Sequence, residues 1–257
     1  LNAKNEVLGT YFCGKQDSVR QLVIDAGNTL IKGAVFENNH ILERFQTKGK
    51  SLADFILAIS ALDQLPQQAL ISSVRADSDS LIESLTDLGI NQVLSFRSGL
   101  KLPIKIQYKT PETLGTDRIA NACMASAIYP QDNILAIDIG TCIKFDMVTA
   151  DQEYLGGSIS PGVKIRYKGL SSFTGKLPYF KKMLDEFPEL IGTSTEGSIR
   201  SGVENGILHE IIGMIDAYGQ RFDNLKIVLT GGDAVRFSQL LKKSGIFVEP
   251  ELTLKGL

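Results

Sequence analysis

One short pattern occurs twice in this sequence and limits the folds that are open to it. An apolar, strand-like run ends in Asp-x-Gly at Asp25–Gly27, and a second run ends in the same way at Asp138–Gly140, about 113 positions later. Each copy continues with a further apolar run, a polar turn and a third strand-like run, at 40–45 and 153–159. A repeat at that distance fits a duplicated domain. We therefore expect two similar halves, each beginning with three adjacent strands.

Helical and strand-like segments alternate after each copy of the pattern. Helices are expected at 51–62, 78–88, 114–129, 195–218 and 233–243, and strands at 69–74, 91–96, 225–229 and 246–248. This order predicts an α/β protein of two lobes with a cleft between them. We assign 1–21 to an N-terminal extension outside the fold, 22–130 to an N-terminal lobe and 131–257 to a C-terminal lobe.

Charge and cysteine content bear on the kinds of partner to expect. The 27 basic and 29 acidic residues leave a formal charge of -2, which gives no electrostatic reason to expect nucleic acid. The apolar stretches are too short to span a bilayer, so no membrane is expected. The three cysteines form no CxxC pair, which argues against a thiolate zinc site or a disulfide framework. Reduced thiols in a cytoplasmic protein are the simpler interpretation.

The two Asp-x-Gly turns carry the residue types of a phosphate site. Glycine lets the backbone approach a ligand, and successive N–H groups in such a turn converge on phosphate oxygens. Asp25 offers a carboxylate for a hydrated cation, Lys32 a positive charge, and Thr29 and Thr141 hydroxyl groups. The same pattern is also that of an Asp-Gly hairpin without a ligand. Its repetition in matching contexts makes the phosphate site a serious hypothesis.

A third glycine turn lies at 229–234, between an expected strand and an expected helix. That arrangement accepts a nucleotide against a helix N-terminus. A Gly-Gly pair also simply marks a turn. Together the three turns suggest two phosphate-binding hairpins and one nucleoside-binding turn.

The ordered set of motifs resembles the type III pantothenate kinases, a branch of the actin-like ATPase (ribonuclease H-like) superfamily. The matching segments, in chain order, are Asp25–Thr29 with Lys32, Tyr108, Leu114–Arg118, Asp138–Thr141 with Asp146, Gly156–Gly162, Thr195, Ser201-Gly202 and Thr230–Gly232. The resemblance runs from Leu22 to Leu257. It implies two duplicated actin-like lobes around a cleft.

The resemblance also implies an activity, which is phosphorylation of pantothenate by ATP as the first step towards coenzyme A, carried out by a homodimer. Asp117 would be the general base. A divalent cation, magnesium, would accompany ATP, and a monovalent cation, potassium or ammonium, would bind Asp138. The ATP phosphates would lie against Asp25, Ala26, Gly27, Asn28, Thr29, Leu30, Ile31, Lys32 and Thr141. Pantothenate would be held by Tyr108, Gly115, Thr116, Asp117 and Arg118, and by Thr195 of the partner subunit.

Each substrate-binding residue has a plainer interpretation. Asp117 and Arg118 could form an exposed ion pair near a helix start. Tyr108 could be a half-buried aromatic residue, and Thr195 could be a helix N-cap.

One position departs from the family pattern. After Gly140-Thr141 the family has Ala-x-Thr-x-Asp, whereas this chain has Cys142-Ile143-Lys144-Phe145-Asp146. Lys144 puts a long cationic side chain where a hydroxyl is expected. We therefore expect Lys144 to weaken any dependence on potassium.

Two rival interpretations remain. A different kinase of the superfamily, acting on a sugar or acetate, would share the phosphate turns but not Tyr108 and 115–118. A non-catalytic accessory protein of transcription would not need intact aspartates. The presence of Asp25, Asp117 and Asp138 favours an enzyme.

Overall fold

A computed structural model describes residues 19–27, 29–47, 51–73, 78–96, 100–241 and 245–257. The chain divides into two compact units, residues 1–128 with 252–257, and residues 129–251. Most of the expected N-terminal extension, residues 1–18, lies outside the described ranges, as does Asn28.

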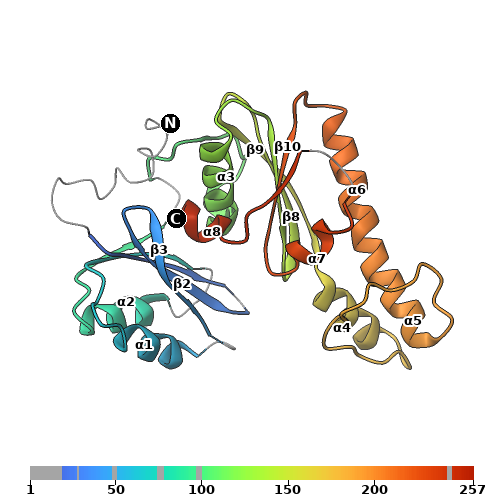
Figure 1. The fold of residues 1–257 in the computed structure, drawn as a ribbon, viewed down its shortest axis with the longest axis horizontal. Coiled ribbons are helices and arrows are strands. Elements are labelled where there is room, and N and C mark those ends of the chain that lie inside the picture. The colour runs from blue at the N-terminus through green and yellow to red at the C-terminus, as the bar shows by residue number, and fades with distance from the viewer. Residues whose placement is uncertain (1–18, 28, 48–50, 74–77, 97–99, 242–244) are drawn as a thin grey trace. The chain divides into compact units, whose positions relative to one another are not determined.

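The first unit is built on a mixed sheet with the strand order β3-β2-β1-β4-β5 (Figure 1). Strands β1, β2 and β3 form an antiparallel meander, β4 runs parallel to β1, and β5 runs parallel to β4. Their bounds are Gln21–Ala26, Ile31–Glu37, His40–Gln46, Gln68–Ser73 and Gln92–Ser95. The three adjacent strands that the sequence predicts are therefore the first three of this sheet.

Helices cover both faces of this sheet. On one face, α1 (Leu52–Ser60) and α2 (Ser78–Asp87) bury apolar side chains against Leu22 and Ile24 of β1. Ser51 caps α1 by accepting a hydrogen bond from the backbone N–H of Asp54 at 3.1 Å. On the other face, a short C-terminal helix, α8 (Leu252–Gly256), packs apolar residues against β1 and β2. Strand residues alternate between the two faces, so β1 is apolar on both of them.

The remaining elements of the unit follow β5 along the chain. These are β6 (Lys105–Ile106), the 3₁₀ turn η2 (Pro111–Thr113) and α3 (Thr116–Ile128). Residues 252–257, which were predicted to belong to the C-terminal lobe, belong to the first unit. Gly256 approaches α3 so closely that a Cβ there would lie 2.0 Å from the carbonyl oxygen of Ala120. A five-residue helix is too short to show a helical apolar periodicity, which is why the sequence does not predict it.

The second unit repeats the strand order of the first. Its strands follow the order β11-β10-β7-β8-β9, with β7, β8 and β9 antiparallel, β10 parallel to β7 and β11 parallel to β10. Their bounds, from β7 to β11, are Ile134–Ile139, Cys142–Val148, Glu153–Pro161, Lys226–Thr230 and Ile246–Val248. The duplication predicted from the two Asp-x-Gly patterns is thus a duplication of sheet topology.

Helices of the second unit are α4 (Val163–Phe173), α5 (Thr195–Arg200), α6 (Gly206–Gly219) and α7 (Ala234–Ser238). The single helix predicted at 195–218 is interrupted by a π-helical turn at Ser201–Asn205, between α5 and α6. Figure 1 shows α6 running along the sheet, with α4 and α5 towards one end of it. A core of apolar residues from β7, β8, β10, α4, α6 and α7 fills the space between them. In the described ranges, no helix combines the length and apolar content that crossing a membrane requires.

Candidate active site

The first hairpin, β1–β2, places an acid and a base opposite each other at the end of a strand. Asp25 and Lys32 are Cα partners in the antiparallel pair, so their side chains leave the same face of the sheet. The backbone N–H of Gly27 donates to the carbonyl of Leu30 at 3.0 Å and closes the connection. A carboxylate and an ammonium group therefore start from neighbouring positions beside the glycine turn.

Ser72, at the end of β4, joins this hairpin to the start of α3. It is the Cα partner of Asp25 in the parallel pair β1–β4. Its hydroxyl, which is 1% exposed, lies 2.7 Å from the hydroxyl of Thr116. Thr116 is the first residue of α3 and precedes Asp117. The first unit therefore brings Asp25 and Asp117 to the same edge of its sheet.

The first turn of α3 fixes the Asp117 carboxylate. Its Oδ1 accepts a hydrogen bond from the backbone N–H of Arg118 at 2.9 Å. A Cβ on Gly115 would lie 2.6 Å from that oxygen, so only glycine leaves room for the carboxylate in this position. A negative charge in the first turn of a helix is also stabilised by the helix dipole. The segment thus presents one oriented, half-buried acid.

Arg118 is buried rather than exposed, with 4% of its surface accessible. Its guanidinium lies 5.8 Å from the centre of the Tyr108 ring. Tyr108 itself is half-buried. The plainer interpretation of Asp117 and Arg118 as an exposed ion pair is therefore wrong for Arg118. Tyr108 and 115–118, separated by a short stretch of sequence, form one cluster at the start of α3.

The second hairpin, β7–β8, repeats the cross-strand placement with a direct contact. Asp138 and Lys144 are Cα partners, and Lys144 Nζ donates to Asp138 Oδ2 at 2.7 Å. Both side chains are mostly buried, at 15% and 17% exposure. Asp146, two residues further along β8, is buried and accepts a hydrogen bond from the Tyr154 hydroxyl at 2.7 Å. Asp146 therefore supports the sheet.

Two glycines let other turns pack onto this hairpin. A Cβ on Gly162 would lie 2.1 Å from the carbonyl oxygen of Gly140 and 2.7 Å from that of Thr141. Gly231 has a φ of +93°, and a Cβ there would lie 2.4 Å from Asp138 Oδ1. The third glycine turn of the sequence and the start of α4 therefore lie directly against the second hairpin. Only a backbone without side chains at these two positions permits that approach.

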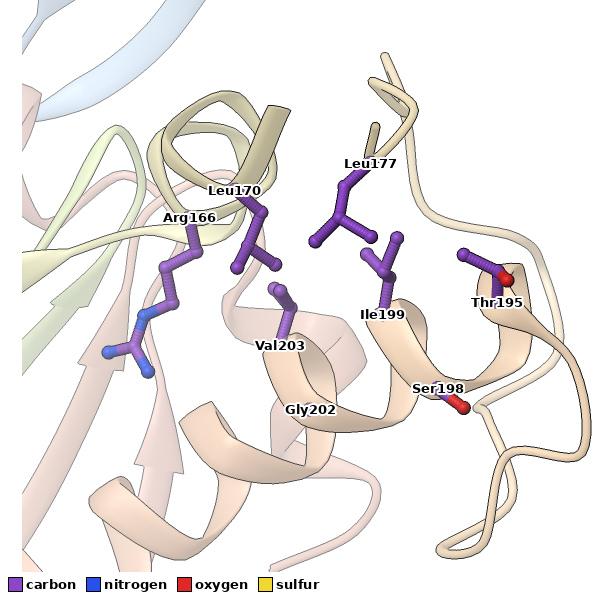
Figure 2. A pocket seen from close by; sticks show the side chains of 8 residues that line it. All are labelled: Arg166, Leu170, Leu177, Thr195, Ser198, Ile199, Gly202 and Val203. Carbon is purple, nitrogen blue, oxygen red and sulfur yellow. The ribbon is translucent and has the colours of Figure 1, made fainter. Parts of the chain in front are cut away.

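A pocket of about 750 Å³ lies further along α4. Figure 2 shows Leu170, Leu177, Ile199 and Val203 pointing towards one another across it, with Thr195 at one end of α5. Thr195 is not the N-cap of this helix, because Ser194 accepts the hydrogen bond from the backbone N–H of Gly197 at 3.0 Å. Its exposed hydroxyl is therefore not committed to capping, and the residue lines the pocket.

The segment between α4 and α5 is held in place by a buried acid. Glu204, in the π-helical turn, has no exposed surface and accepts hydrogen bonds from the Tyr167 hydroxyl at 2.6 Å and from Arg236 at 2.7 Å. Arg236 also donates to the carbonyls of Asp185 and Glu186, each at 3.1 Å. Burial, and then the bond to Glu204, raises the pKa of Tyr167. Tyr167 therefore remains a hydrogen-bond donor over the whole neutral range.

Comparison with known proteins decides the family. The family model described as type III pantothenate kinase matches residues 21–217. The chain belongs to the type III pantothenate kinase family. A type III pantothenate kinase of Christiangramia forsetii is 42% identical over 240 residues, which cover 92% of this chain and 95% of the relative. One of Cytophaga hutchinsonii is 43% identical over 237 residues, covering 92% and 96%.

Solved structures with much lower identity share the fold of this family member. A proposed Baf family transcriptional activator of Campylobacter jejuni matches with a TM-score of 0.56 and 20% identity, over 91% of this chain and 94% of that one. The ethanolamine utilization protein EutJ of Carboxydothermus hydrogenoformans matches with a TM-score of 0.52 and 11% identity, over 97% and 92%. The type III pantothenate kinase chain thus has the duplicated actin-like α/β fold that the sequence predicts.

Sequence reasoning missed Ser72 in this member of the pantothenate kinase family. The sequence predicts a strand at 69–74 and the structure ends it at Ser73, so the polar residues near the end of a buried strand were a signal that could have been used. The partner of Ser72 across the sheet, Asp25, and its hydrogen-bond partner, Thr116, are both more than 40 residues away. Only the fold shows that these residues meet.

A divalent cation that accompanies ATP would need few ligands from this pantothenate kinase. Within the described ranges, no three His, Cys, Asp or Glu side chains are grouped so as to hold a metal ion. A divalent cation that arrives with ATP needs no such group, because it keeps several waters and takes phosphate oxygens with one or two carboxylates. Asp25, half-buried beside the glycine turn, fits that role.

Proposed function

We propose that this protein transfers the γ-phosphoryl group of ATP to pantothenate, which gives 4'-phosphopantothenate, the first step of coenzyme A synthesis. The observation that carries the proposal is the Asp25–Ser72–Thr116 connection. It gathers a phosphate-type hairpin and an oriented carboxylate, Asp117, at one edge of one unit. Family membership supplies the name of the acceptor.

ATP is proposed to bind by its phosphates. The residues proposed for this are those of the first hairpin, Asp25 to Lys32, together with Thr141 of the second. Backbone N–H groups of the glycine turn would donate to phosphate oxygens, and the Lys32 ammonium would offset their negative charge. A divalent cation, when bound, neutralises charge between the β- and γ-phosphates. Asp25 would hold it on the protein side.

Asp117 is proposed as the general base. The pantothenate hydroxyl gives its proton to Asp117 while its oxygen forms a bond to the γ-phosphorus. The bond from that phosphorus to the bridging oxygen breaks, and ADP leaves. The hydrogen bond from the Arg118 N–H fixes one carboxylate oxygen in place, which aims the group at the acceptor. Most of the rate enhancement comes from in-line positioning and charge neutralisation rather than from the base itself.

Pantothenate is proposed to lie against Tyr108 and 115–118. The buried Arg118 guanidinium and the Tyr108 ring form a firm wall there, since each packs on the other. Thr116 is held by Ser72, so the first turn of α3 is anchored to the sheet. A rigid first turn keeps Asp117 within hydrogen-bonding reach of the acceptor hydroxyl.

A homodimer is proposed, with Thr195 completing the acceptor site of the partner. Several large apolar side chains of α4 and the following segment are exposed, among them Phe173 at 91%, Leu190 at 70% and Ile191 at 80%. A second copy of the chain would remove this surface from water. We also propose the cytoplasm as its compartment, where ATP is supplied and thiols such as Cys123 and Cys142 stay reduced.

The monovalent cation that the family resemblance implies at Asp138 does not fit beside Lys144. The ammonium group of Lys144 already occupies one oxygen of that carboxylate at 2.7 Å. No step of the proposed reaction passes through such an ion.

The test is a phosphorylation assay with pantothenate, a hexose and acetate as acceptors. Turnover with pantothenate alone is expected. Asp117→Asn should lower kcat by about 100-fold or more, because the carboxylate no longer accepts the proton. Asp79→Asn is the matched control, since Asp79 lies in the first turn of α2 and should change nothing. Turnover with another acceptor only would overturn the proposed function. Full activity of Asp117→Asn would overturn the assignment of Asp117 as the general base.

A further inference from the structure

The contact between Lys144 and Asp138 lies where a bound ion would have to lie. The two residues are Cα partners on neighbouring strands, and the ammonium nitrogen is 2.7 Å from Asp138 Oδ2. Both side chains are largely shielded from water, so the pair is little weakened by salt. A contact of this length is that of a charge-assisted hydrogen bond. Lys144 therefore helps to hold the two strands of the hairpin together.

The other side of the carboxylate is closed by backbone. Gly231 approaches Asp138 Oδ1 so closely that a Cβ would lie 2.4 Å from that oxygen. An alkali ion replaces its water shell with several oxygen ligands and needs room for them. Between the Gly231 turn and the Lys144 ammonium, this room is taken, and the ion would also face a like charge.

The first unit shows what a lysine in this position is suited to do. Lys32 stands opposite Asp25 in β1–β2 as Lys144 stands opposite Asp138 in β7–β8. Both lysines are thus placed at the phosphate-type end of a hairpin, by the same register in the same strand order. A lysine there delivers a point charge towards phosphate without any bound ion.

We propose that the Lys144 ammonium replaces the monovalent cation at Asp138, so that this kinase works without potassium or ammonium ions. The proposal rests on the proposed function only in that the charge is used on ATP phosphates. Lys144 is a positioning and charge-supplying residue of the second hairpin. The departure from the family pattern at 142–146 then replaces a bound monovalent cation with the positive charge of Lys144.

The experiment compares wild type, Lys144→Thr and Lys168→Thr in potassium chloride and in choline chloride. Lys168 is an exposed lysine of α4 in the same unit and controls for the loss of one positive charge. Both salts are used at about 100 mM, so that screening of exposed charges is the same. The phosphorylated product is measured directly by chromatography, because coupling enzymes bring ion requirements of their own.

Wild type and Lys168→Thr should turn over at equal rates in the two salts. Lys144→Thr should be at least about ten-fold slower in choline and should recover in potassium, because the vacated carboxylate and the new hydroxyl can then take up an ion. A ten-fold activation of wild type by potassium, or the same response in wild type and Lys144→Thr, would overturn the proposal.

Thermal unfolding in the two salts gives a second readout that needs no turnover. An ion that binds only the folded state raises the melting temperature. Potassium should raise it for Lys144→Thr and not for wild type. If Lys144→Thr is inactive in both salts, this comparison decides, and an equal shift in both proteins contradicts the inference. Absence of pantothenate phosphorylation by wild type in either salt would instead contradict the proposed function.

Discussion

In both units a strand whose penultimate residue is Asp pairs with a strand that carries Lys directly opposite, and a fourth strand runs parallel to the first. The units differ in what they attach to this frame. The first unit continues into α3, whose first turn holds Asp117 beside Ser72. The second continues into α4, the pocket with Thr195, and the buried Glu204 network. The comparison suggests that the shared frame handles phosphates, while the attachments determine the acceptor and the partner subunit.

The largest effect on stability is expected from the buried Glu204 network of the second unit. Glu204→Ala removes the buried acceptor of Tyr167 and Arg236 and leaves a cationic side chain without its acid. We expect the free energy of unfolding to fall by about 3–5 kcal/mol, measured by urea denaturation. Glu196→Ala is the control, because the Glu196 side chain is 52% exposed and Arg200, which is 9% exposed, keeps its hydrogen bond to the carbonyl of Lys182 at 3.2 Å and its contact with the Phe180 ring, so we expect a clearly smaller loss. Similar losses in the two variants would refute a special role of the buried network.

A smaller loss is expected where α4 meets the second hairpin. Gly162→Ala would put a methyl group 2.1 Å and 2.7 Å from two backbone carbonyl oxygens, so the turn has to move. The free energy of unfolding should fall by about 2–3 kcal/mol, seen as a lower melting temperature.

Gly140→Ala provides the comparison within the hairpin itself. Its Cβ would lie 3.5 Å from Asp138 Oδ1, which is an ordinary contact, and we expect a loss below about 1 kcal/mol. If Gly140→Ala proves the more damaging of the two, the packing of α4 is not what shapes this turn.

In the first unit, a change at the contact between Ser72 and the start of α3 should lower activity more than stability. Ser72→Ala removes the hydroxyl that holds Thr116 at 2.7 Å, so the first turn of α3 is less firmly placed. A fall of about five-fold in kcat/KM is expected, equivalent to about 1 kcal/mol. Ser84→Ala, in α2, should leave kcat/KM unchanged, since the Ser84 hydroxyl donates to the carbonyl of Ser80 in its own helix. If kcat/KM is unchanged in Ser72→Ala, Ser72 has no role in positioning α3 for the reaction.

The smallest effect concerns a cysteine of α3. Burial raises the pKa of Cys123 to about 12, so at pH 8 only about one thiol in ten thousand is ionised in the folded state. Iodoacetamide should therefore leave Cys123 unmodified, as read by peptide mass spectrometry. The half-buried Cys142 of the second hairpin should react first and serves as the internal control. Rapid labelling of Cys123 would show that α3 opens readily.

The sequence predicted the repeated frame because its signals are local. Asp-x-Gly after an apolar run, a polar turn and a third run are all read within about 25 residues, and the family motifs follow the same order. The Asp138–Lys144 pair could also have been predicted, because two strands joined by a tight turn place the residues on either side of that turn opposite each other.

What the sequence did not reveal depends on distant residues or on weak periodicity. Ser72 meets Asp25 and Thr116 only through the parallel pairing of β1 with β4. Helix α4 packs Val163, Tyr167 and Leu170 into the core at helical spacing, but its other apolar residues, Ile165 and Phe173, are exposed and blur the pattern, and the helix was not predicted. The π-helical turn interrupts a continuous apolar pattern, and the glycines at 202 and 206 weaken a helix without predicting a π-turn. In each case tertiary contacts outweigh local preference.

The π-helical turn at Ser201–Asn205 has a consequence for how this protein tolerates changes in length. Such a turn holds one residue more than a regular α-helical turn, and each residue advances an α-helix by about 100°. Removing a single residue there would leave a regular α-helical turn, so α5 and α6 would merge while Thr195 and Ile199 kept their direction about the helix axis. A deletion in the regular turns of α6 would instead rotate the residues on one side of it by about 100° relative to those on the other, so the π-helical turn is where this helix can lose a residue at least cost.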